Sequence, residues 1–369
     1  MALTLPLWAV LTGALIGVLM VVVAGAVWLA ARRRARLRAD SRPAVPNAAN
    51  AQHPVTVTVT VTAAGAPQPA GDTLPTRLGR YQLDRPIGRG AMGTVYLAHD
   101  TSSARVVAIK TLALASEFDG AELAQARERF FREANMAGRL QHPDIVAIFE
   151  TGEAHGLAFI AMEFVDGHDL FRYTLPGRLL PMGAALRVLA RVARALAHAH
   201  RHGVVHRDVK PANVMIDALA AAGAANGIVK VTDFGIARIA DARRTRTGLV
   251  LGTPSFMAPE QLAGGTIDSR TDLYSLGVML FQLLTGALPH TAEAMGRLMH
   301  QIADDVAPDV RSLRPELPQA LADVVARAIE KRPEARYADG DRFAADLLAL
   351  ALALAPVAAT IGPPGGDSR

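Results

Sequence analysis

A short polar stretch near the middle of the chain restricts its fold more than any other feature. The chain there reads His206-Arg207-Asp208-Val209-Lys210-Pro211-Ala212-Asn213, and Asp233-Phe234-Gly235 follows 25 residues after Asp208. Carboxylate and amide oxygens are ligands for magnesium in phosphate-handling sites, and a nearby lysine can neutralise a phosphate. The fold must therefore bring both segments to one site, and the residue types favour phosphoryl transfer.

A glycine-rich pattern lies upstream of this stretch. Gly88, Gly90 and Gly93 are followed by Val95 in the order G-x-G-x-x-G-x-V. Dinucleotide-binding folds share such glycines, but there a helix follows them. Here Thr94-Val95-Tyr96-Leu97 is β-branched and aromatic, which favours a strand. We therefore expect a hairpin whose glycines let the backbone approach a phosphate.

The combination of these motifs resembles the protein-kinase family. An apolar strand ending in lysine, Val106-Val107-Ala108-Ile109-Lys110, stands between the glycines and the polar stretch, in the order that kinases show. Lys210 makes the chain similar to the Hanks-type (eukaryotic-like) bacterial serine/threonine protein kinases rather than to tyrosine kinases. The resemblance covers residues 80–350. It implies an α+β, two-lobed protein-kinase fold, with a small β-rich N-lobe at about 78–165 and a larger helical C-lobe at about 166–350.

The resemblance implies a catalytic role for four residues. Asp208 would orient the substrate hydroxyl, and Lys210 would neutralise the transferred phosphoryl group. Lys110 would meet the α- and β-phosphates of ATP and pair with Glu133 on a following helix, with Glu128 on a neighbouring turn as the alternative. The implied reaction transfers the γ-phosphoryl group of ATP to serine or threonine hydroxyls of proteins.

ATP and Mg²⁺ are the cofactors that the resemblance implies, and Mn²⁺ could replace Mg²⁺. Asn213 and Asp233 would bind the metal ion. Met162 would be the gatekeeper beside the hinge, and Asp169 would be a ribose partner. The residues expected to line the nucleotide site, on the hairpin, the lysine strand, the hinge and the floor, are Ile87, Gly88, Arg89, Gly90, Ala91, Met92, Gly93, Thr94, Val95, Ala108, Lys110, Met162, Glu163, Val165 and Met215.

Residues 233–260 resemble the activation segment of these kinases. Thr245 and Thr247 lie among arginines, at positions that bacterial members autophosphorylate. A phosphate there would be clamped by arginines, with Arg207 as the expected partner. A homodimer would allow the autophosphorylation to occur in trans.

The resemblance also gives structural roles to residues outside the chemistry. Glu260 would form a buried ion pair with Arg336, and breaking one side of such a pair is costly. Asp272 would anchor the catalytic loop from a central helix, and Thr253 would contact the same loop.

The first 77 residues precede the expected kinase domain, which we place at 78–350. Residues 7–31 are uncharged and exceed the roughly 20 residues that a transmembrane helix needs. Six arginines follow by position 42, so the positive-inside rule predicts residues 1–6 outside the cytoplasm and the remainder within it. We expect a single-pass protein of the cell (inner or plasma) membrane with a cytoplasmic kinase domain. A cleaved signal peptide is the alternative, but it would need positive charge before a shorter apolar core.

Three further segments complete the organisation. Residues 32–77 are a basic juxtamembrane segment followed by a Pro-, Ala- and Thr-rich linker, which we expect to be a disordered spacer. The period-two alternation at 55–62 leaves open a strand that pairs with another copy. The Ala-rich connection at 217–227 is longer than usual in the family, and we attach no function to it. Residues 351–369 are expected to be a flexible tail.

Composition excludes several function classes. The chain has no cysteine, so disulfide, zinc–thiolate and thiol chemistry are impossible. The net charge of +5 reflects the arginine cluster near the apolar run and gives no reason to expect nucleic acid. Two rival functions remain. The intact motif residues argue against a membrane-anchored pseudokinase scaffold that binds nucleotide without transfer. The long activation segment argues against an ATP-dependent phosphotransferase for small molecules.

Overall fold

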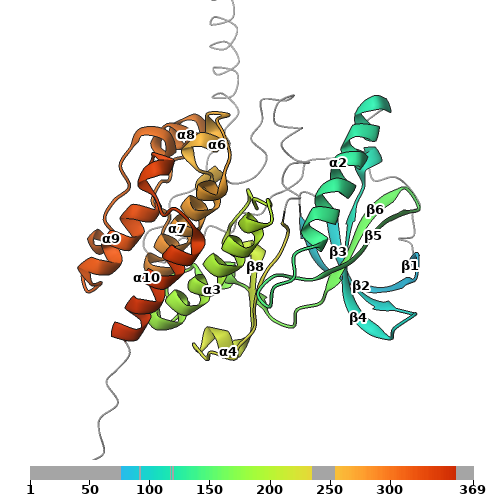
Figure 1. The fold of residues 1–369 in the computed structure, drawn as a ribbon, viewed down its shortest axis with the longest axis horizontal. Coiled ribbons are helices and arrows are strands. Elements are labelled where there is room, and N and C mark those ends of the chain that lie inside the picture. The colour runs from blue at the N-terminus through green and yellow to red at the C-terminus, as the bar shows by residue number, and fades with distance from the viewer. Residues whose placement is uncertain (1–75, 91–92, 117, 119, 235–253, 355–369) are drawn as a thin grey trace, which may run out of the picture. The chain divides into compact units, whose positions relative to one another are not determined.

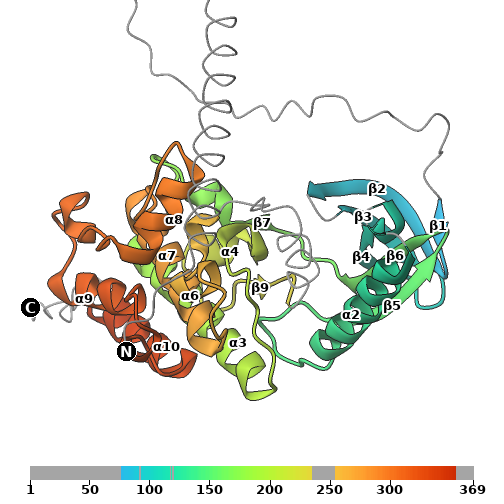
Figure 2. The same ribbon diagram turned by 90° about the horizontal axis from the view of Figure 1, so that it is seen from above.

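The computed structural model describes residues 76–90, 93–116, 118, 120–234 and 254–354, which form two lobes (Figure 1 and Figure 2). The N-lobe is an antiparallel sheet whose neighbouring strands follow the order β1-β2-β3-β4-β6-β5. A short 3₁₀ helix, η1 (Leu114–Ser116), and one long helix join β4 to β5. The elements of this lobe are β1 (Arg77–Leu78), β2 (Tyr81–Gly90), β3 (Gly93–Asp100), β4 (Arg105–Leu112), α2 (Gly120–Gly138), β5 (Ile148–Ala154) and β6 (Leu157–Glu163).

Side-chain alternation gives this sheet two apolar faces. On β6, Phe159 and Ala161 pack into a cluster with Tyr81, whereas Ile160 between them packs with Phe130 of α2. Successive side chains of a strand point to opposite faces, so a run of apolar residues can serve both. The result is that α2 is fixed against one face of the sheet, beside β5 (Figure 2).

The C-lobe is built from helices around a single apolar core. Its small sheet has the strand order β7-β8-β9. The helices and strands are β7 (His168–Asp169), α3 (Met182–Arg201), β8 (Val214–Ile216), α4 (Ala218–Ala221), β9 (Val229–Val231), α6 (Pro259–Leu262), α7 (Ser269–Thr285), α8 (Met295–Asp304), α9 (Gln319–Ala328) and α10 (Gly340–Ala353). The 3₁₀ helices are η2 (Leu170–Tyr173), η3 (Pro211–Asn213), η4 (Pro254–Phe256), η5 (Val310–Ser312) and η6 (Pro333–Ala335).

Helices α3 and α7 form the centre of the C-lobe. Most of their residues are buried, and α3 packs on both α7 and α10. Gly277 in α7 allows a close approach to α9, because a Cβ there would lie 2.6 Å from the Cβ of Ala328. Gly203, in a left-handed conformation with φ +74°, follows the end of α3. Glycine is the usual residue just after the end of a helix, because it adopts this conformation without strain.

The two-lobed α+β architecture agrees with the sequence prediction, and α10 is its final helix. The Ala-rich connection at 217–227 is more than a surface loop, because it contains α4. Several predictions lie outside the described residues: the apolar run at 7–31, the strand at 55–62, Ala91 and Met92, the threonines of the activation segment (Thr245, Thr247 and Thr253), and most of the 351–369 tail. Among the helices that the structure does describe, none is both long and apolar enough to cross a bilayer.

Candidate active site

The glycine-rich hairpin is formed by β2 and β3. The two strands pair from Tyr81 with Asp100 to Gly90 with Gly93, as predicted. Gly93 has φ +135°, and a Cβ at this position would lie 1.8 Å from the carbonyl oxygen of Thr111 on β4. Only glycine fits there, because any other side chain would clash with that backbone. The hairpin is therefore held directly against the strand that carries Lys110.

Lys110 forms an ion pair across the two lobes. It is buried on β4, and its Nζ lies 2.8 Å from Oδ1 of Asp233, which follows β9. Asp233 has φ +63°, an unusual conformation for a residue other than glycine. Burial by itself would raise the pKa of the Asp233 carboxyl, but the Lys110 ammonium outweighs this and lowers it below the usual value. Asp233 is therefore a carboxylate at neutral pH, as a metal ligand must be.

The helix α2 presents one of its two candidate carboxylates inward. Glu133 is buried and Glu128 is exposed, so the structure favours Glu133 as the residue that faces the site. The ion pair described for Lys110 is the one with Asp233, so the predicted pair with Glu133 stays a prediction. In this conformation the backbone of Asp233 brings its carboxylate to the lysine.

The catalytic loop brings together three of the predicted residues. Lys210 Nζ donates to Oδ2 of Asp208 at 2.7 Å. Asn213 Nδ2 donates to the backbone oxygen of Asp208 at 2.8 Å and to its Oδ2 at 3.1 Å. The amide nitrogen of Asn213 is thereby used within the loop, which leaves its carbonyl oxygen as the atom that can bind a cation. Lys210 and Asp208 are each about one-third exposed, so a substrate hydroxyl can reach them.

Asp272 of α7 anchors this loop, as predicted. Its carboxylate is fully buried and accepts hydrogen bonds from the backbone N–H of His206 at 2.8 Å and of Arg207 at 2.7 Å. His200 Nε2 lies 2.7 Å from the same carboxylate, a contact that sequence reasoning missed. Arg207 has φ +69°, so these bonds hold the backbone in a conformation that it would otherwise avoid.

Glu260 and Arg336 form the predicted buried ion pair. Arg336 Nη1 lies 2.7 Å from Oε1 of Glu260, and Nη2 lies 2.8 Å from Oε2. Backbone oxygens of Arg270, Glu330 and Lys331 accept the remaining guanidinium hydrogen bonds. Burial would raise the pKa of Glu260, but the Arg336 hydrogen bonds lower it below its usual value. The pair joins α6, which follows the activation segment, to the loop before α10.

The predicted hinge follows β6, and Met162, the predicted gatekeeper, lines a pocket. Ala108 of β4 pairs with Met162, and Met215 of β8 pairs with Lys230 of β9. The Glu163 carboxylate accepts a hydrogen bond from Lys230 Nζ at 2.8 Å, a contact that the sequence did not suggest.

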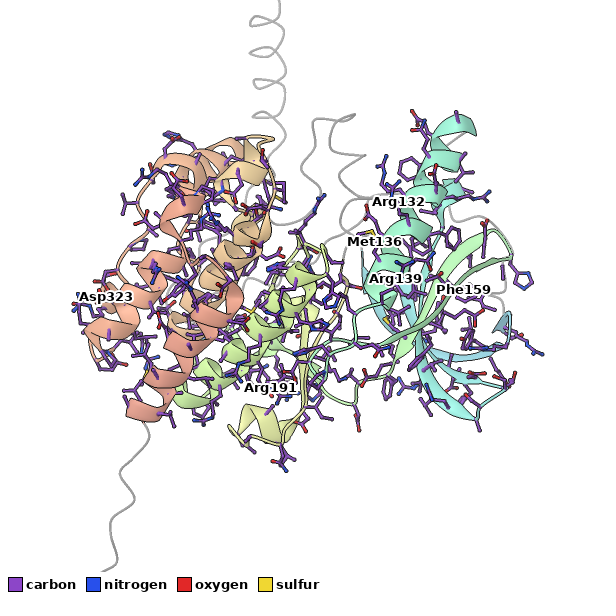
Figure 3. All side chains as sticks on the ribbon, in the orientation of Figure 1. Arg132, Met136, Arg139, Phe159, Arg191 and Asp323 are labelled. Atoms are coloured by element: carbon purple, nitrogen blue, oxygen red, sulfur yellow. The ribbon has the colours of Figure 1, made fainter. Side chains whose placement is uncertain are left out.

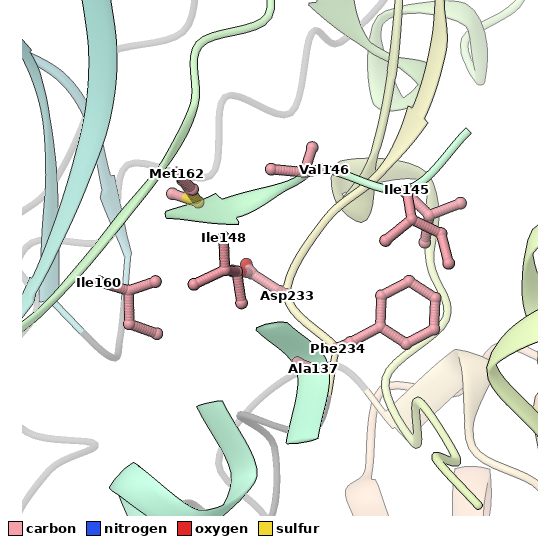
Figure 4. Close-up of a pocket in the computed structure, with 9 residues that line it drawn as sticks. Ala137, Ile145, Val146, Ile148, Ile160, Met162, Asp233 and Phe234 are labelled. Atoms are coloured by element: carbon pink, nitrogen blue, oxygen red, sulfur yellow. The ribbon is translucent and has the colours of Figure 1, made fainter. Parts of the chain in front are cut away.

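Figure 4 shows the pocket that Met162 lines, which is apolar apart from Asp233. Its lining residues are Ala137, Ile145, Val146, Ile148, Ile160, Met162, Val231, Asp233 and Phe234.

The donor set fits a divalent cation held jointly with a nucleotide. Asp233 is ionised, and the carbonyl oxygen of Asn213 is available, as described above. Among the described residues, no group of three or more His, Cys, Asp or Glu side chains could hold a metal by itself. Magnesium usually takes one or two protein ligands together with water and phosphate oxygens, so two protein ligands are sufficient.

A glycine-rich hairpin above a buried lysine, facing an Asp-Lys-Asn loop on a helical lobe, defines the protein-kinase class of folds. A family model described as "Protein kinase domain" matches residues 81–348. Serine/threonine-protein kinase PrkC of Bacillus subtilis is 38% identical over 270 residues, which are 73% of this chain and 40% of that protein. Serine/threonine-protein kinase PknJ of Mycobacterium tuberculosis is 42% identical over 271 residues, which are 72% of this chain and 44% of that protein.

A solved structure agrees with these relatives. The crystal structure of the Mycobacterium tuberculosis PknI kinase domain superposes with a TM-score of 0.58 at 32% identity, covering 73% of this chain and 96% of that chain. The chain therefore belongs to the protein kinase family, among the Hanks-type serine/threonine kinases of bacteria. It spans 40% to 44% of the length of the two relatives described above.

Proposed function

We propose that this chain is an ATP-dependent serine/threonine protein kinase. The observation that carries the proposal is the Asp208–Lys210–Asn213 cluster on one lobe, together with the Lys110–Asp233 ion pair that joins it to the other. Each residue needed to position a phosphoryl group and a hydroxyl is present. The names of the relatives support serine and threonine hydroxyls of proteins as the acceptors.

The reaction follows from the positions of these groups. The substrate hydroxyl oxygen attacks the γ-phosphorus, the bond from that phosphorus to the β–γ bridging oxygen breaks, and ADP leaves. Asp208 orients the hydroxyl and accepts its proton, while Lys210 neutralises the charge on the transferred group. Magnesium, when bound, neutralises the β- and γ-phosphates, and Asn213 and Asp233 would hold it. Lys110 would then turn from Asp233 toward the α- and β-phosphates.

The test is transfer of label from γ-radiolabelled ATP by the full chain with Mg²⁺, beside an Asp208→Asn variant, followed by mapping of the modified residues. Label on protein serine or threonine that disappears in the variant supports the proposal. ATP binding without transfer in the wild type would instead support the pseudokinase scaffold. Label that reaches only small metabolites would support the small-molecule phosphotransferase.

Activation by autophosphorylation is a separate part of the proposal. The sequence places Thr245 and Thr247 among three arginines, Arg243, Arg244 and Arg246, where an added phosphate could be clamped. A homodimer would bring the segment of one copy to the site of the other. Replacing both threonines with alanine should lower the activity toward other proteins, and undiminished activity would contradict the switch.

We further propose that residues 7–31 anchor the chain in the cell membrane as a single span, with the kinase domain in the cytoplasm. The support is the uncharged length of the run and the six arginines that follow it. This topology also gives the kinase domain access to ATP, which a domain on the outer face would lack. On cell fractionation, the full chain should appear in the membrane fraction and should resist extraction at alkaline pH. A variant that lacks residues 7–31 should do neither. Extraction of the full chain at alkaline pH would overturn the anchor.

A further inference from the structure

The Ala-rich connection at 217–227 folds into a compact unit. Asp217 begins α4 and accepts a hydrogen bond from the backbone N–H of Ala220 at 2.7 Å, a typical helix N-cap. The chain then turns back on α4, because a Cβ on Gly227 would lie 2.1 Å from the nitrogen of Ala220. Strand β9 begins two residues after Gly227, and Asp233 lies two residues after the end of β9.

Two arginines of α3 hold this unit. Arg187 and Arg191 are four residues apart and therefore lie on one face of the helix. Arg187 Nε donates to the backbone oxygen of Gly223 at 3.1 Å, and Arg191 Nη1 donates to that of Gly227 at 2.5 Å. Figure 3 shows Arg191 where α3 faces α4. The residues that lead into β9 are thus fixed to a central helix of the C-lobe.

Arg191 also binds the connection between α2 and β5. Its Nε lies 3.0 Å from Oδ1 of Asp144, and its Nη2 contacts the same oxygen. The Asp144 side chain is only 9% exposed and that of Arg191 is 28% exposed, so water weakens this pair less than a surface pair. Seven residues further along the same face of α3, the His198 ring packs against that of His142 at an interplanar angle of 44°, with ring centroids 5.2 Å apart.

The same connection is hydrogen-bonded to β9. Val231 N–H donates to the backbone oxygen of Asp144 at 2.9 Å, and Val146 N–H donates to that of Val231 at 3.0 Å. One guanidinium group therefore lies at the meeting point of three segments: the C-lobe helix α3, the insertion that leads to Asp233, and the connection that leads from Glu133 on α2. Motion of either catalytic carboxylate relative to α3 must strain its hydrogen bonds.

We propose that Arg191, supported by the 217–227 insertion, is a positioning residue that sets α2 and Asp233 relative to the C-lobe. It acts through Asp144 and Gly227 and does not touch the nucleotide. Arginine is required because its planar fork reaches a carboxylate and a carbonyl at once, whereas lysine has one ammonium group. Small displacements of reacting groups cost much of the rate, so the effect falls on kcat more than on KM for ATP.

The experiment compares full-length wild type with Arg191→Ala, Arg191→Lys, Asp144→Ala and Asp217→Ala. Arg191→Ala should lower kcat by roughly 10- to 100-fold with a much smaller change in KM for ATP. Asp144→Ala should act in the same direction, and the double variant should be less than multiplicative because both remove one contact. Arg191→Lys should have a kcat close to that of Arg191→Ala. Asp217→Ala should lower kcat less than Arg191→Ala does. Arg201→Ala is the matched control, since Arg201 is on the same helix but its pair with Asp341 is exposed.

An activity-independent readout keeps this inference separate from the proposed kinase function on which its kinetic part rests. Hydrogen exchange at the amides of Val146 and Val231 should speed up in Arg191→Ala and remain unchanged in Arg201→Ala. An inactive wild type would overturn the kinase proposal, while the exchange data would still decide the inference. Unchanged exchange, or an unchanged kcat per folded molecule, would overturn the positioning role.

Discussion

The Nζ of Lys110 lies 2.8 Å from Oδ1 of Asp233, so an ion pair connects the two lobes at the candidate active site. During transfer, both groups are needed elsewhere, the lysine at the phosphates and the aspartate at the metal ion. In the described structure, each of the two charges compensates the other. Binding of nucleotide and metal must separate the pair. Substitution of either residue should therefore lower the activity.

Lys110→Met should reduce kcat/KM by about 100-fold or more while leaving the protein folded. The methionine fills the buried volume on β4 but removes the positive charge that meets the phosphates. The measurement is steady-state transfer with calorimetry of unfolding in parallel. The pKa of Asp233 should also rise, because its stabilising ammonium is gone. Activity within about threefold of wild type would contradict the assigned role.

Asp208→Asn should lower kcat by about 10²- to 10⁴-fold, the range for loss of a general base, without a comparable loss of ATP affinity. The side chain keeps its shape and can still accept from Asn213, but it no longer attracts the hydroxyl proton. Transfer assays and nucleotide titration of the same preparation separate the two effects. A parallel loss of ATP binding would show that the carboxylate acts on the nucleotide instead.

Asp272→Asn should slow transfer and destabilise the C-lobe by about 1–3 kcal/mol, the cost of unsatisfied buried groups. The carboxylate uses both oxygens to accept from the His206 and Arg207 backbones, and an amide offers only one acceptor oxygen. Urea unfolding and kcat measure the two consequences. Wild-type stability in the variant would mean that the hydrogen bonds to the loop contribute little.

Arg336→Lys should destabilise the protein by about 1–3 kcal/mol, because the charge remains but buried acceptors lose their hydrogen bonds. Lysine cannot reproduce the bidentate contact with Glu260 or the bonds to three backbone oxygens. Arg332→Lys is the control, because Arg332 is exposed and lies 3.8 Å from Glu334. Equal urea unfolding midpoints for Arg336→Lys and Arg332→Lys would contradict this prediction.

Stability should fall as the pH decreases from about 6.5 toward 4, in part because of His290. Burial, followed by the nearby Lys331 ammonium, lowers the pKa of His290 from 6.5 to about 4, although Asp305 opposes this. The folded state therefore binds fewer protons than the unfolded state in this window, and stability is complete only above it. A shift of this size corresponds to about 3 kcal/mol at the acid end.

The histidine prediction is checked by urea unfolding at pH 7.5 and pH 5 for wild type and His290→Gln. Glutamine can still accept from Lys331, which lies 3.1 Å from Nε2 of His290, but it does not titrate. The variant should lose less stability on acidification than the wild type. His142 and His198, whose pKa values burial also lowers, retain the remaining dependence. His300→Gln is the exposed control, and the same pH dependence in His290→Gln and wild type would contradict the assignment.

Short-range motifs were predictable because their contacts form within a few residues. Asp208, Lys210 and Asn213 lie within six consecutive positions. A loop of that length keeps their side chains close together. The strand character after the glycines follows from residue type in the same way. The Glu260–Arg336 pair, 76 residues apart, was found only through the family resemblance.

The contacts decided by tertiary structure join residues far apart in the chain. Lys110 and Asp233 are 123 positions apart, and which carboxylate the lysine meets depends on where α2 and the segment after β9 lie. Arg191 and Asp144 are 47 positions apart, and neither belongs to a motif that sequence reasoning could single out. Residue type and spacing determined which groups could react, because local geometry limits a short loop to few arrangements. The packing of helices and sheet chose the partners, because the energy of an ion pair depends on burial and separation that no local pattern records.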